Sequence, residues 1–403
     1  MEKKIRIIFG IGFLICSVLL VLTLPYGKEG AIIIGILLLL SIANFQKNLF
    51  IQYIVFLVVL LLLFQTYFGN ILVDRDYITL TSNTRINTIV VGDAIPGVSG
   101  LISVQTDNKG FRVSKHINYE QPAPYRIFTI GGSTTEQIYL DDRQTSSFLL
   151  QCKLEEFLKQ PVEVINTGVS GLLARNHLAT LKKIEKYHPN LVIIMMGAND
   201  WNRQIRNHFS KPNSVLTALR ARYSFEFSPV SKLANHLYNY FKGPTAGTKV
   251  KIENGAWLSE HNNTLSRRAI KYDYEPQEVS EEFKFYTKEL FTKCREGKYK
   301  TIIVSQISSY KENASNELKK YYWSTPPDED YTLSFKSMVY LANLYNCYLE
   351  KEAKSYGFIF CEVDNIPPTT GYFYDDMHVN KKGSEILADD IFSCIVKNHL
   401  IKN

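Results

Sequence analysis

The sequence lacks every pattern by which cysteine usually signals a metal site or a redox motif. Its six cysteines, among 403 residues, form no CxxC pair and no zinc-ligand spacing. We therefore expect no metal and no cofactor. An odd number beyond residue 100 argues against a full disulfide framework, and mostly apolar neighbours favour buried thiols, although one disulfide stays open. These five are Cys152, Cys294, Cys347, Cys361 and Cys394.

A basic stripe interleaved with aromatic residues, the usual sign of nucleic-acid binding, is also missing. The formal net charge is +7, from 46 Lys and Arg against 39 Asp and Glu, but the cations are scattered beyond residue 70. The sequence therefore predicts no nucleic-acid partner. Scattered basic residues are typical of an ordinary solvent-exposed surface, and they could also hold a domain near anionic lipid or an acidic polymer.

Charge is absent from three apolar runs at the start of the chain, residues 7–24, 31–45 and 49–68. The first and third have about the 20 residues that a membrane-spanning helix needs, whereas the second is short and could be re-entrant or interfacial. A cleaved signal peptide is the alternative for the first run, but no small-residue cleavage pattern follows it. We expect residues 1–70 to be a membrane anchor of three helices, with the lipid bilayer as partner.

Basic residues set the expected orientation of this anchor. Lys3, Lys4 and Arg6 favour a cytoplasmic N-terminus. Three crossings then place residue 70 onward outside the cytoplasm, whereas two crossings place it inside. Lys47, between the second and third runs, also favours the inside. We expect a multi-pass membrane protein whose large domain is extracytoplasmic.

From residue 121 onward, short apolar runs alternate with helical periodicity, which is typical of parallel strands joined by helices. Continuous apolar runs indicate strands that are covered on both faces. We expect an α/β domain at 121–403 with a doubly wound parallel sheet of about five strands, preceded by a β-rich linker region at 71–120. The expected strands are 126–130, 162–166, 191–196, 301–306 and 358–363, and the expected helices are 146–159, 174–187, 280–296, 333–355 and 381–400.

The first expected strand ends in GGSTTE, and ligands of a doubly wound sheet bind at such carboxyl ends. Ser133 would begin a helix, where free N–H groups favour developing negative charge. This predicts a nucleophile, although a glycine turn with a serine N-cap is also a common structural device. A phosphate-binding loop is a third interpretation, but the Gly-Lys-Ser/Thr of a P-loop is missing.

A serine nucleophile needs a base, and the base needs an orienting acid. The DDMH segment offers His378 as base and Asp375 as its partner, with Asp376 as a competing partner. A helix cap with a surface histidine is the structural alternative. Two further strands end in NTGVSG and GAND, whose Gly171 N–H and Asn199 amide could stabilise an oxyanion, though both also suit ordinary turns.

In this order, the four blocks resemble those of the SGNH hydrolase family, also called GDSL esterases. The resemblance covers roughly residues 120–400 and implies a flavodoxin-like fold. Gly132 replaces the aspartate of the family's Gly-Asp-Ser, which departs from the common lipase-like members. GFR followed by GGSTT resembles a membrane-anchored, polysaccharide-associated bacterial branch. The implied residues are Ser133 as nucleophile, His378 as general base, Asp375 as its partner, and Ser133, Gly171 and Asn199 as the oxyanion hole.

An insertion at about 201–280 interrupts the pattern, and we expect specificity to reside there. Arginine suits a carboxylate or phosphate, so the start of the insertion could bind substrate or could form a solvated helix face. Residues 231–241 have helical apolar spacing and could be a lid, a membrane-facing surface or ordinary packing, and 245–265 could be a mobile loop. The candidate substrate-binding residues are Trp201, Arg203, Arg206 and His208.

The resemblance implies an esterase or deacylase that removes a small acyl group, such as acetyl, from a cell-surface glycan or lipid through an acyl-enzyme. The same triad could pass the acyl group to a sugar hydroxyl, as an O-acyltransferase, with a membrane acyltransferase as a further partner. Another interpretation is a membrane-tethered binding or assembly protein with an inactive site. A phosphate-ester binder would need a metal or basic cluster beside Ser133, and no metal-ligand spacing is present.

Overall fold

The computed structural model describes most of the chain beyond the apolar runs. Residues 76–210 and 244–403 belong to one compact unit. No helix in the described part is both long and apolar enough to cross a membrane. The runs at 7–24, 31–45 and 49–68 and the apolar segment at 231–241 lie outside the described residues. The structure describes residues 76–401 except 115–116, 122–124, 210–246, 268–269, 325 and 327–328.

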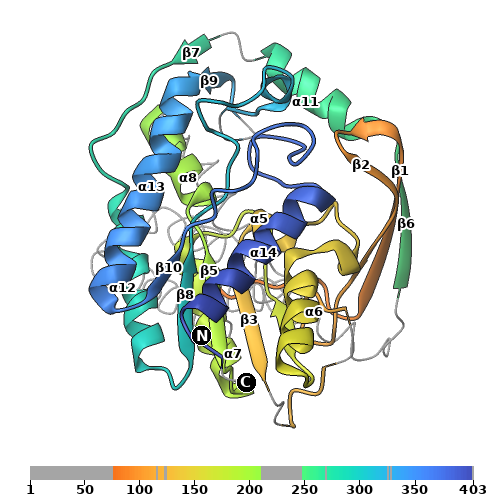
Figure 1. The fold of residues 1–403 in the computed structure, drawn as a ribbon. Coiled ribbons are helices and arrows are strands. Elements are labelled where there is room, and N and C mark those ends of the chain that lie inside the picture. The colour runs from red at the N-terminus through yellow and green to blue at the C-terminus, as the bar shows by residue number, and fades with distance from the viewer. Residues whose placement is uncertain are drawn as a thin grey trace, which may run out of the picture. The chain divides into compact units, whose positions relative to one another are not determined.

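A five-stranded parallel sheet forms the centre of this unit (Figure 1). Its spatial order is β10-β8-β5-β3-β4, and each neighbouring pair is parallel. Counted along the chain, this is the 2-1-3-4-5 order of flavodoxin-like sheets, so the predicted α/β fold is confirmed. The strands are β3 (Arg126–Gly131), β4 (Glu163–Asn166), β5 (Leu191–Met195), β8 (Lys300–Val304) and β10 (Ile359–Cys361).

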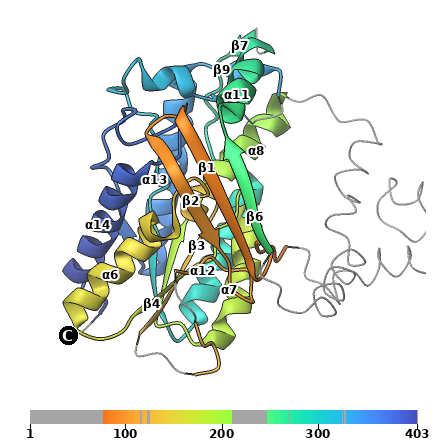
Figure 2. The same ribbon diagram turned by 90° about the vertical axis from the view of Figure 1, so that its right-hand side faces the viewer.

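A second sheet stands beside the first (Figure 2). β1 (Thr84–Ile95) and β2 (Val98–Gln105) form an antiparallel hairpin, and β6 (Gly247–Glu253) pairs with β1 in parallel. The expectation of a mobile loop at 245–265 is therefore wrong, because this segment forms β6 and most of α11 (Ala256–Arg267). Pairing with a distant strand stabilises a polar segment whose own sequence does not indicate a buried strand.

The two faces of this outer sheet differ in burial. Its inner face packs against Trp257 and Tyr374 in a hydrophobic core separate from that of the central sheet. On its outer face, Ile89 pairs with Leu101 on one side and with Ile252 on the other, which makes an apolar row across three strands. These three side chains are 40%, 62% and 66% exposed. Such a contiguous exposed row is typical of an interaction surface.

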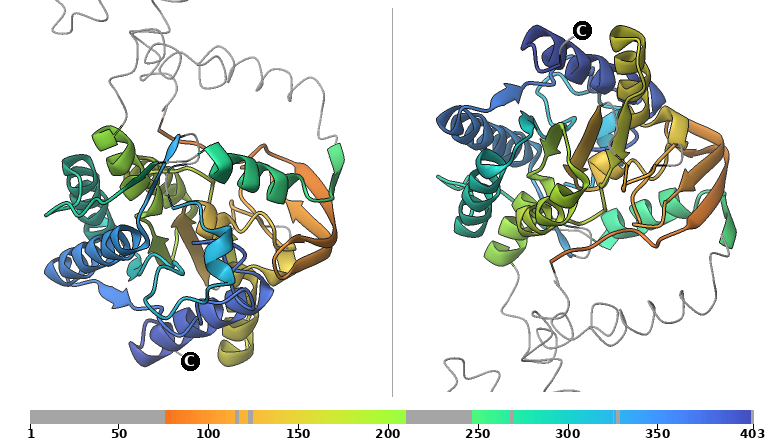
Figure 3. Two further views of the ribbon diagram at one scale, coloured as in Figure 1. Left: turned by 90° about the horizontal axis from the view of Figure 1, so that it is seen from above. Right: turned by 90° about the horizontal axis from the view of Figure 1, so that it is seen from below.

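Helices cover both faces of the central sheet (Figure 3). α6 (Ser146–Leu158) and α14 (Lys381–Lys397) pack together on one face, while α7 (Ala174–Ile184), α12 (Glu281–Glu296) and α13 (Phe335–Tyr356) lie on the other. Every residue of β3 and β5 is buried as a result. This two-sided cover explains why the strand sequences are continuously apolar instead of alternating.

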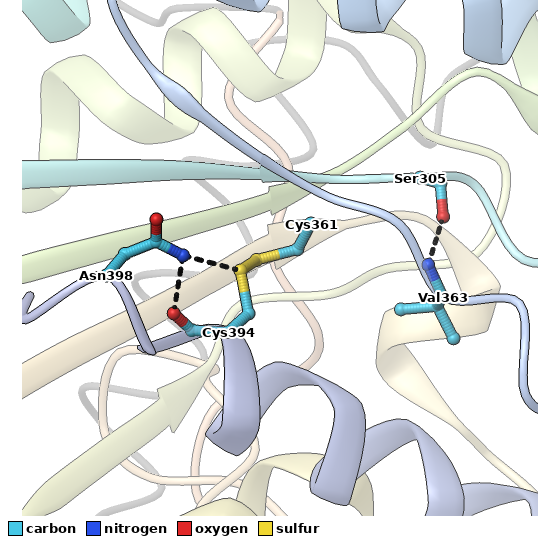
Figure 4. Close-up of a disulfide and its surroundings, with 5 residues drawn as sticks. All are labelled: Ser305, Cys361, Val363, Cys394 and Asn398. Carbon is cyan, nitrogen blue, oxygen red and sulfur yellow. Dashed lines mark hydrogen bonds between the residues drawn. A yellow bond between two sulfur atoms is a disulfide. The ribbon is translucent and has the colours of Figure 1, made fainter. Parts of the chain in front are cut away.

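One disulfide and several short elements complete the fold, together with one longer helix that begins beside the site. A disulfide joins Cys361 of β10 to Cys394 of α14 (Figure 4). The sequence left one disulfide open, and only the packing of α14 beside an edge strand pairs these two residues. Cys294 is a buried thiol as expected, but Cys152 and Cys347 are exposed. The remaining elements are α5 (Ser133–Glu136), η1 (Asp142–Gln144), η2 (Glu185–Tyr187), α8 (Ala198–Phe209), β7 (Ile270–Tyr272), η4 (Leu318–Tyr321) and β9 (Tyr331–Leu333).

Candidate active site

Ser133 is separated from the end of β3 by Gly132 alone and is the first residue of α5. It therefore lies where the strand order of the sheet reverses, between β3 and β5, which is the usual ligand position in such folds. The chain is tightly packed at the preceding Gly132, because a Cβ atom there would stand 2.7 Å from Asn199 Nδ2. The aspartate of the Gly-Asp-Ser pattern would not fit this arrangement unless Asn199 moved.

Ser133, His378 and Asp375 form one hydrogen-bonded chain. His378 Nε2 lies 2.8 Å from Ser133 Oγ, and His378 Nδ1 lies 2.8 Å and 3.0 Å from the two carboxylate oxygens of Asp375. Asp375 is buried and also accepts hydrogen bonds from the backbone N–H groups of Met377 and His378. A carboxylate held in this way favours the tautomer with the proton on Nδ1, which leaves Nε2 to accept from the serine.

The loop that carries His378 is closed by its own residues. A β-bridge joins Phe373 to Val379, and both side chains are buried. The Asn380 side chain then caps α14 by accepting from the N–H groups of Lys382 and Gly383. Because unpaired N–H groups at a helix start favour such a cap, the local sequence fixes where the loop ends and the helix begins.

The electrostatic surroundings of His378 favour its charged form. Burial lowers the pKa of His378, but the nearby carboxylates, above all Asp375 and then Asp376 and Glu136, raise it by more, so the pKa lies above its ordinary value. The side chain is still 24% exposed, and its ring stacks on Tyr374. The imidazolium that forms when a base takes a proton is therefore stabilised here.

Asp376, the competing partner for the histidine, turns to another part of the chain. It is buried and accepts from the Tyr310 hydroxyl and from the backbone N–H groups of Trp323 at 3.1 Å and Ser324 at 3.2 Å. Burial, with the charge of Asp375 beside it, raises the pKa of Asp376 to about 6. Asp376 thus anchors the segment at 323–324, and Asp375 alone holds His378.

Three N–H donors named by the sequence line one cleft with Ser133 Oγ: those of the Ser133 and Gly171 backbones and of the Asn199 side chain. Asn199 Nδ2 donates to the carbonyl oxygen of Leu172 at 2.9 Å, and its second hydrogen has no partner among the described residues. The backbone N–H groups of Ser133 and Gly171 likewise donate to no described residue. Unpaired donors beside a nucleophile suit a developing oxyanion.

Glu136, which the sequence did not single out, connects two of these segments. Its buried carboxylate accepts from the backbone N–H and the hydroxyl of Ser170, both at 2.6 Å. Glu136 ends the short helix that Ser133 begins, and Ser170 precedes Gly171. This pair of hydrogen bonds therefore fixes the distance between two of the predicted oxyanion donors.

Arg112 is a second residue whose importance the sequence did not reveal. It ends the DNKGFR segment, residues 107–112, in which Gly110 has a positive φ of 79°. Its buried guanidinium donates to Asp142 Oδ1 at 2.8 Å and to three backbone carbonyl oxygens of the chain just after Ser133. No local pattern distinguishes such an arginine from a solvated one, because all its partners lie at least 24 residues away. The carbonyls belong to Glu136, Gln137 and Leu140.

A cleft of about 650 Å³ opens over Ser133 and His378. Helical spacing decides which residues after Asn199 line it, since side chains three and four apart share one face of α8. Trp201 instead packs in the core against Tyr345, and His208 stacks on Tyr274, so these two predicted substrate-binding residues do not line the cleft. The α8 residues in the cleft are Asn199, Asn202, Arg203 and Arg206.

A parallel α/β sheet that brings serine, histidine and aspartate together at its carboxyl edge is the arrangement of a serine ester hydrolase. The family described as GDSL-like lipase/acylhydrolase matches residues 127–391. This match spans more than half of the chain, so the chain belongs to that family and is an acyl-ester hydrolase. The predicted resemblance to the SGNH or GDSL family is thereby confirmed, whereas the membrane-anchored, polysaccharide-associated branch stays a prediction. No curated protein matches the chain in sequence.

Several solved structures are similar to this chain. LAE5, an α/β hydrolase from the metagenome of Lake Arreo, Spain, shares 12% identity over 71% of this chain and 100% of its own, with a TM-score of 0.40. Axe2, an acetylxylan esterase from Geobacillus stearothermophilus, shares 14% over 68% and 94%, with 0.39. The psychrotrophic esterase EstA from Pseudoalteromonas sp. shares 15% over 68% and 98%, with 0.37. The assignment rests on the family match and not on these distant likenesses.

Proposed function

We propose that the chain removes a small acyl group, such as acetyl, from a cell-surface glycan or lipid through an acyl-enzyme on Ser133. The observation that carries this proposal is the continuous hydrogen-bonded chain from Asp375 through His378 to Ser133, which opens into a cleft beside unpaired N–H donors. A nucleophile, a base and an oxyanion site within one cleft are what acyl transfer requires.

Each group has one step to perform. Ser133 Oγ attacks the ester carbonyl carbon while His378 Nε2 accepts the hydroxyl proton. Negative charge develops on the carbonyl oxygen, where the Ser133, Gly171 and Asn199 N–H groups would stabilise it. His378 returns the proton to the departing alcohol as the ester C–O bond breaks. Water then attacks the acyl-enzyme while His378 accepts its proton, and His378 returns this proton to Ser133 Oγ as the acid is released. Asp375 stabilises the imidazolium throughout.

A second candidate function is O-acyl transfer to a sugar hydroxyl in place of water. The cleft of about 650 Å³ has room for an acceptor sugar, because an acetyl group alone would fill only a small part of it, although a glycan substrate would fill the same space. Both reactions share the acyl-enzyme and differ in which hydroxyl reaches it. In the second case, a membrane acyltransferase is the proposed partner. An inactive binding protein would not need the complete chain of Ser133, His378 and Asp375.

The proposal is tested by the intact mass of the purified protein after treatment with a fluorophosphonate, with peptide mapping. An adduct on Ser133 that the Ser133→Ala variant lacks is the expected result. A folded wild-type protein without an adduct would count against an activated nucleophile. Acetate release from an acetylated glycan, with and without an added acceptor sugar, then separates hydrolysis from transfer: transfer retains the acetyl group on the acceptor.

We further propose that residues 1–70 anchor the enzyme in a bacterial cytoplasmic membrane and that its catalytic domain is extracytoplasmic. Disulfides such as Cys361–Cys394 persist mainly in oxidising compartments, which supports that side. Only residues 69–83 separate the last apolar run from β1, whose Ile89 belongs to the exposed apolar row. A phosphatase reporter that is active only outside the cytoplasm should be active when joined after residue 75. An inactive phosphatase, together with fluorescence from a reporter that fluoresces only in the cytoplasm, would support two spans instead.

A further inference from the structure

Part of the cleft wall is aromatic and begins at the reacting histidine. Tyr374 stacks on His378, with ring centroids 5.4 Å apart, and Trp257 packs edge-on against Tyr374 at 6.1 Å. Trp323 follows at 6.5 Å from Trp257, and both tryptophans line the cleft. The C–H face of a sugar ring packs well on such flat rings while its hydroxyls remain free to form hydrogen bonds.

This aromatic wall is held firmly in place. Trp257, 8% exposed, is part of the core behind the outer sheet. The backbone N–H groups of Trp323 and Ser324 both donate to the buried Asp376. Ser324 adopts a left-handed conformation (φ 55°), which a non-glycine residue keeps only when its surroundings impose it. The buried carboxylate of Asp376 therefore fixes the backbone that carries Trp323 in the cleft wall.

Another part of the wall is cationic. Along α8, Arg203 and Arg206 lie one and two turns beyond Asn199, so Arg206 is about 10 Å further along the cleft at 1.5 Å per residue. Arg203 Nε pairs with Glu282 at 2.7 Å, and Arg206 Nε pairs with Glu329 at 2.9 Å. The two side chains are 39% and 43% exposed.

These ion pairs orient the guanidinium groups. In Arg203, the Nη groups make no hydrogen bond with any described residue, so this edge is available to a ligand. Because each arginine is paired with a glutamate, the wall carries little net charge, and recognition depends on the geometry of the guanidinium fork. A planar fork with one edge fixed and the other open suits a carboxylate or a phosphate better than a neutral hydroxyl.

We propose that the substrate is an acidic glycan, in which an O-acylated sugar ring packs on Trp323, with the buried Trp257 behind it, while a carboxylate or phosphate of the same or the next unit binds Arg203 and Arg206. The inference rests on the proposed esterase function for its kinetic test. Its binding test is independent of catalysis. An ester of a neutral lipid would use the aromatic wall but would leave both arginines without a ligand.

The binding test uses the full chain in detergent as the Ser133→Ala variant, titrated calorimetrically with unacylated oligosaccharides of equal length. The probes are a neutral xylo-oligosaccharide, an oligogalacturonate and a phosphate-bearing oligosaccharide. We expect one of the two acidic probes to bind about 10- to 100-fold more tightly than the neutral one, and the preferred probe identifies the anion. Equal affinity for all three would overturn the inference, even if the protein proves to be an active esterase.

The matched variants are Arg203→Gln with Arg206→Gln, and Arg143→Gln as control. Arg143 is an exposed arginine of η1 outside the cleft, so removing it changes the net charge without touching the wall. The double variant should bring the acidic-to-neutral affinity ratio to near one, while Arg143→Gln should leave it unchanged. An equal effect of both variants would show long-range charge instead of a binding site, and would overturn the inference.

The kinetic test compares kcat/KM for acetylated forms of the same oligosaccharides and for p-nitrophenyl acetate. We expect Trp323→Leu to lower the values for the glycans more than the value for the small ester. An equal loss on all substrates would contradict a sugar-binding role for the wall. If the wild type hydrolyses no ester while the acidic probes still bind the Ser133→Ala variant, the proposed function fails and the inferred ligand class stands.

Discussion

The central parallel sheet and the outer three-stranded sheet contribute to the same cleft in different ways. Ser133 and Asn199 lie just beyond the carboxyl ends of β3 and β5, two central strands that are buried on both faces. The outer sheet contributes no reacting group, and its inner face supports Trp257 and Tyr374. The difference teaches that the groups for ester chemistry stand at the edge of the central sheet, while two aromatic residues of the cleft wall are supported by the outer sheet.

The DDMH segment shows this division within two residues. Asp375 belongs to the central site through His378, whereas Asp376 holds Trp323 and Ser324 on the recognition side. The two residues lie in a bend, where Asp375 accepts from the N–H groups of Met377 and His378, so neighbours in sequence serve different surfaces. The following predictions test whether the two regions are separable in function.

The largest effect is expected at the end of the central sheet. Ser133→Ala removes the nucleophile, and kcat for an acetyl ester should fall by about 10⁶-fold, as in other serine hydrolases whose triad acts as a unit. Acetate release measures the loss, and an unchanged melting temperature serves as the control for folding. Activity within tenfold of wild type would contradict the assignment of Ser133.

The two aspartates should separate the regions directly. Asp375→Asn keeps the position of His378 but removes its negatively charged partner and changes which ring nitrogen carries the proton. We therefore expect kcat to fall by about 10⁴-fold. Asp376→Asn should instead raise KM for glycans and lower the free energy of unfolding by about 1–3 kcal/mol, because buried donors lose a charged acceptor. Kinetics and chemical denaturation of both variants measure this. Equal kcat losses would show that the regions are not separable.

Arg112 lies at the joint between the two sheets, because its backbone pairs with Thr106 at the end of β2 and with Asn166 at the end of β4. Arg112→Met would leave Asp142 and three carbonyl oxygens without their donor, so we expect a loss of about 3–5 kcal/mol in the free energy of unfolding. The exposed Arg85 is the matched control, and Arg85→Met should cost less than about 0.5 kcal/mol. Similar melting curves for both variants would contradict a structural role for the joint.

The smallest expected effect is a shift in pH dependence. His378 must be neutral to accept the serine proton, so the rate falls as the pH drops through the pKa of His378. Because the carboxylates hold that pKa above its ordinary value, this acid limb should lie above about pH 6.5 in the wild type. In Asp375→Asn the limb should move to lower pH. A limb that moves upward, or stays in place, would contradict the coupling between the two residues.

The sequence by itself determined the central sheet and the residues at its edge. Strands buried on both faces must be apolar throughout, and a serine after two glycines or a histidine before a capped helix is visible without knowing what lies nearby. The family resemblance then predicted which of these residues meet. The same local period predicted a helix after Asn199, but not which of its faces is turned to the core, so Trp201 and His208 were placed wrongly.

Only the tertiary structure decided the features that depend on distant partners. β6 is a strand because it pairs with β1, more than 150 residues earlier. Cys361 and Cys394 are joined because α14 packs beside β10. Asp375, and not Asp376, holds His378 because each carboxylate finds a different set of donors. Local sequence limits the conformation of each segment, whereas contact partners follow from how the segments pack, and packing joins residues that no short pattern links.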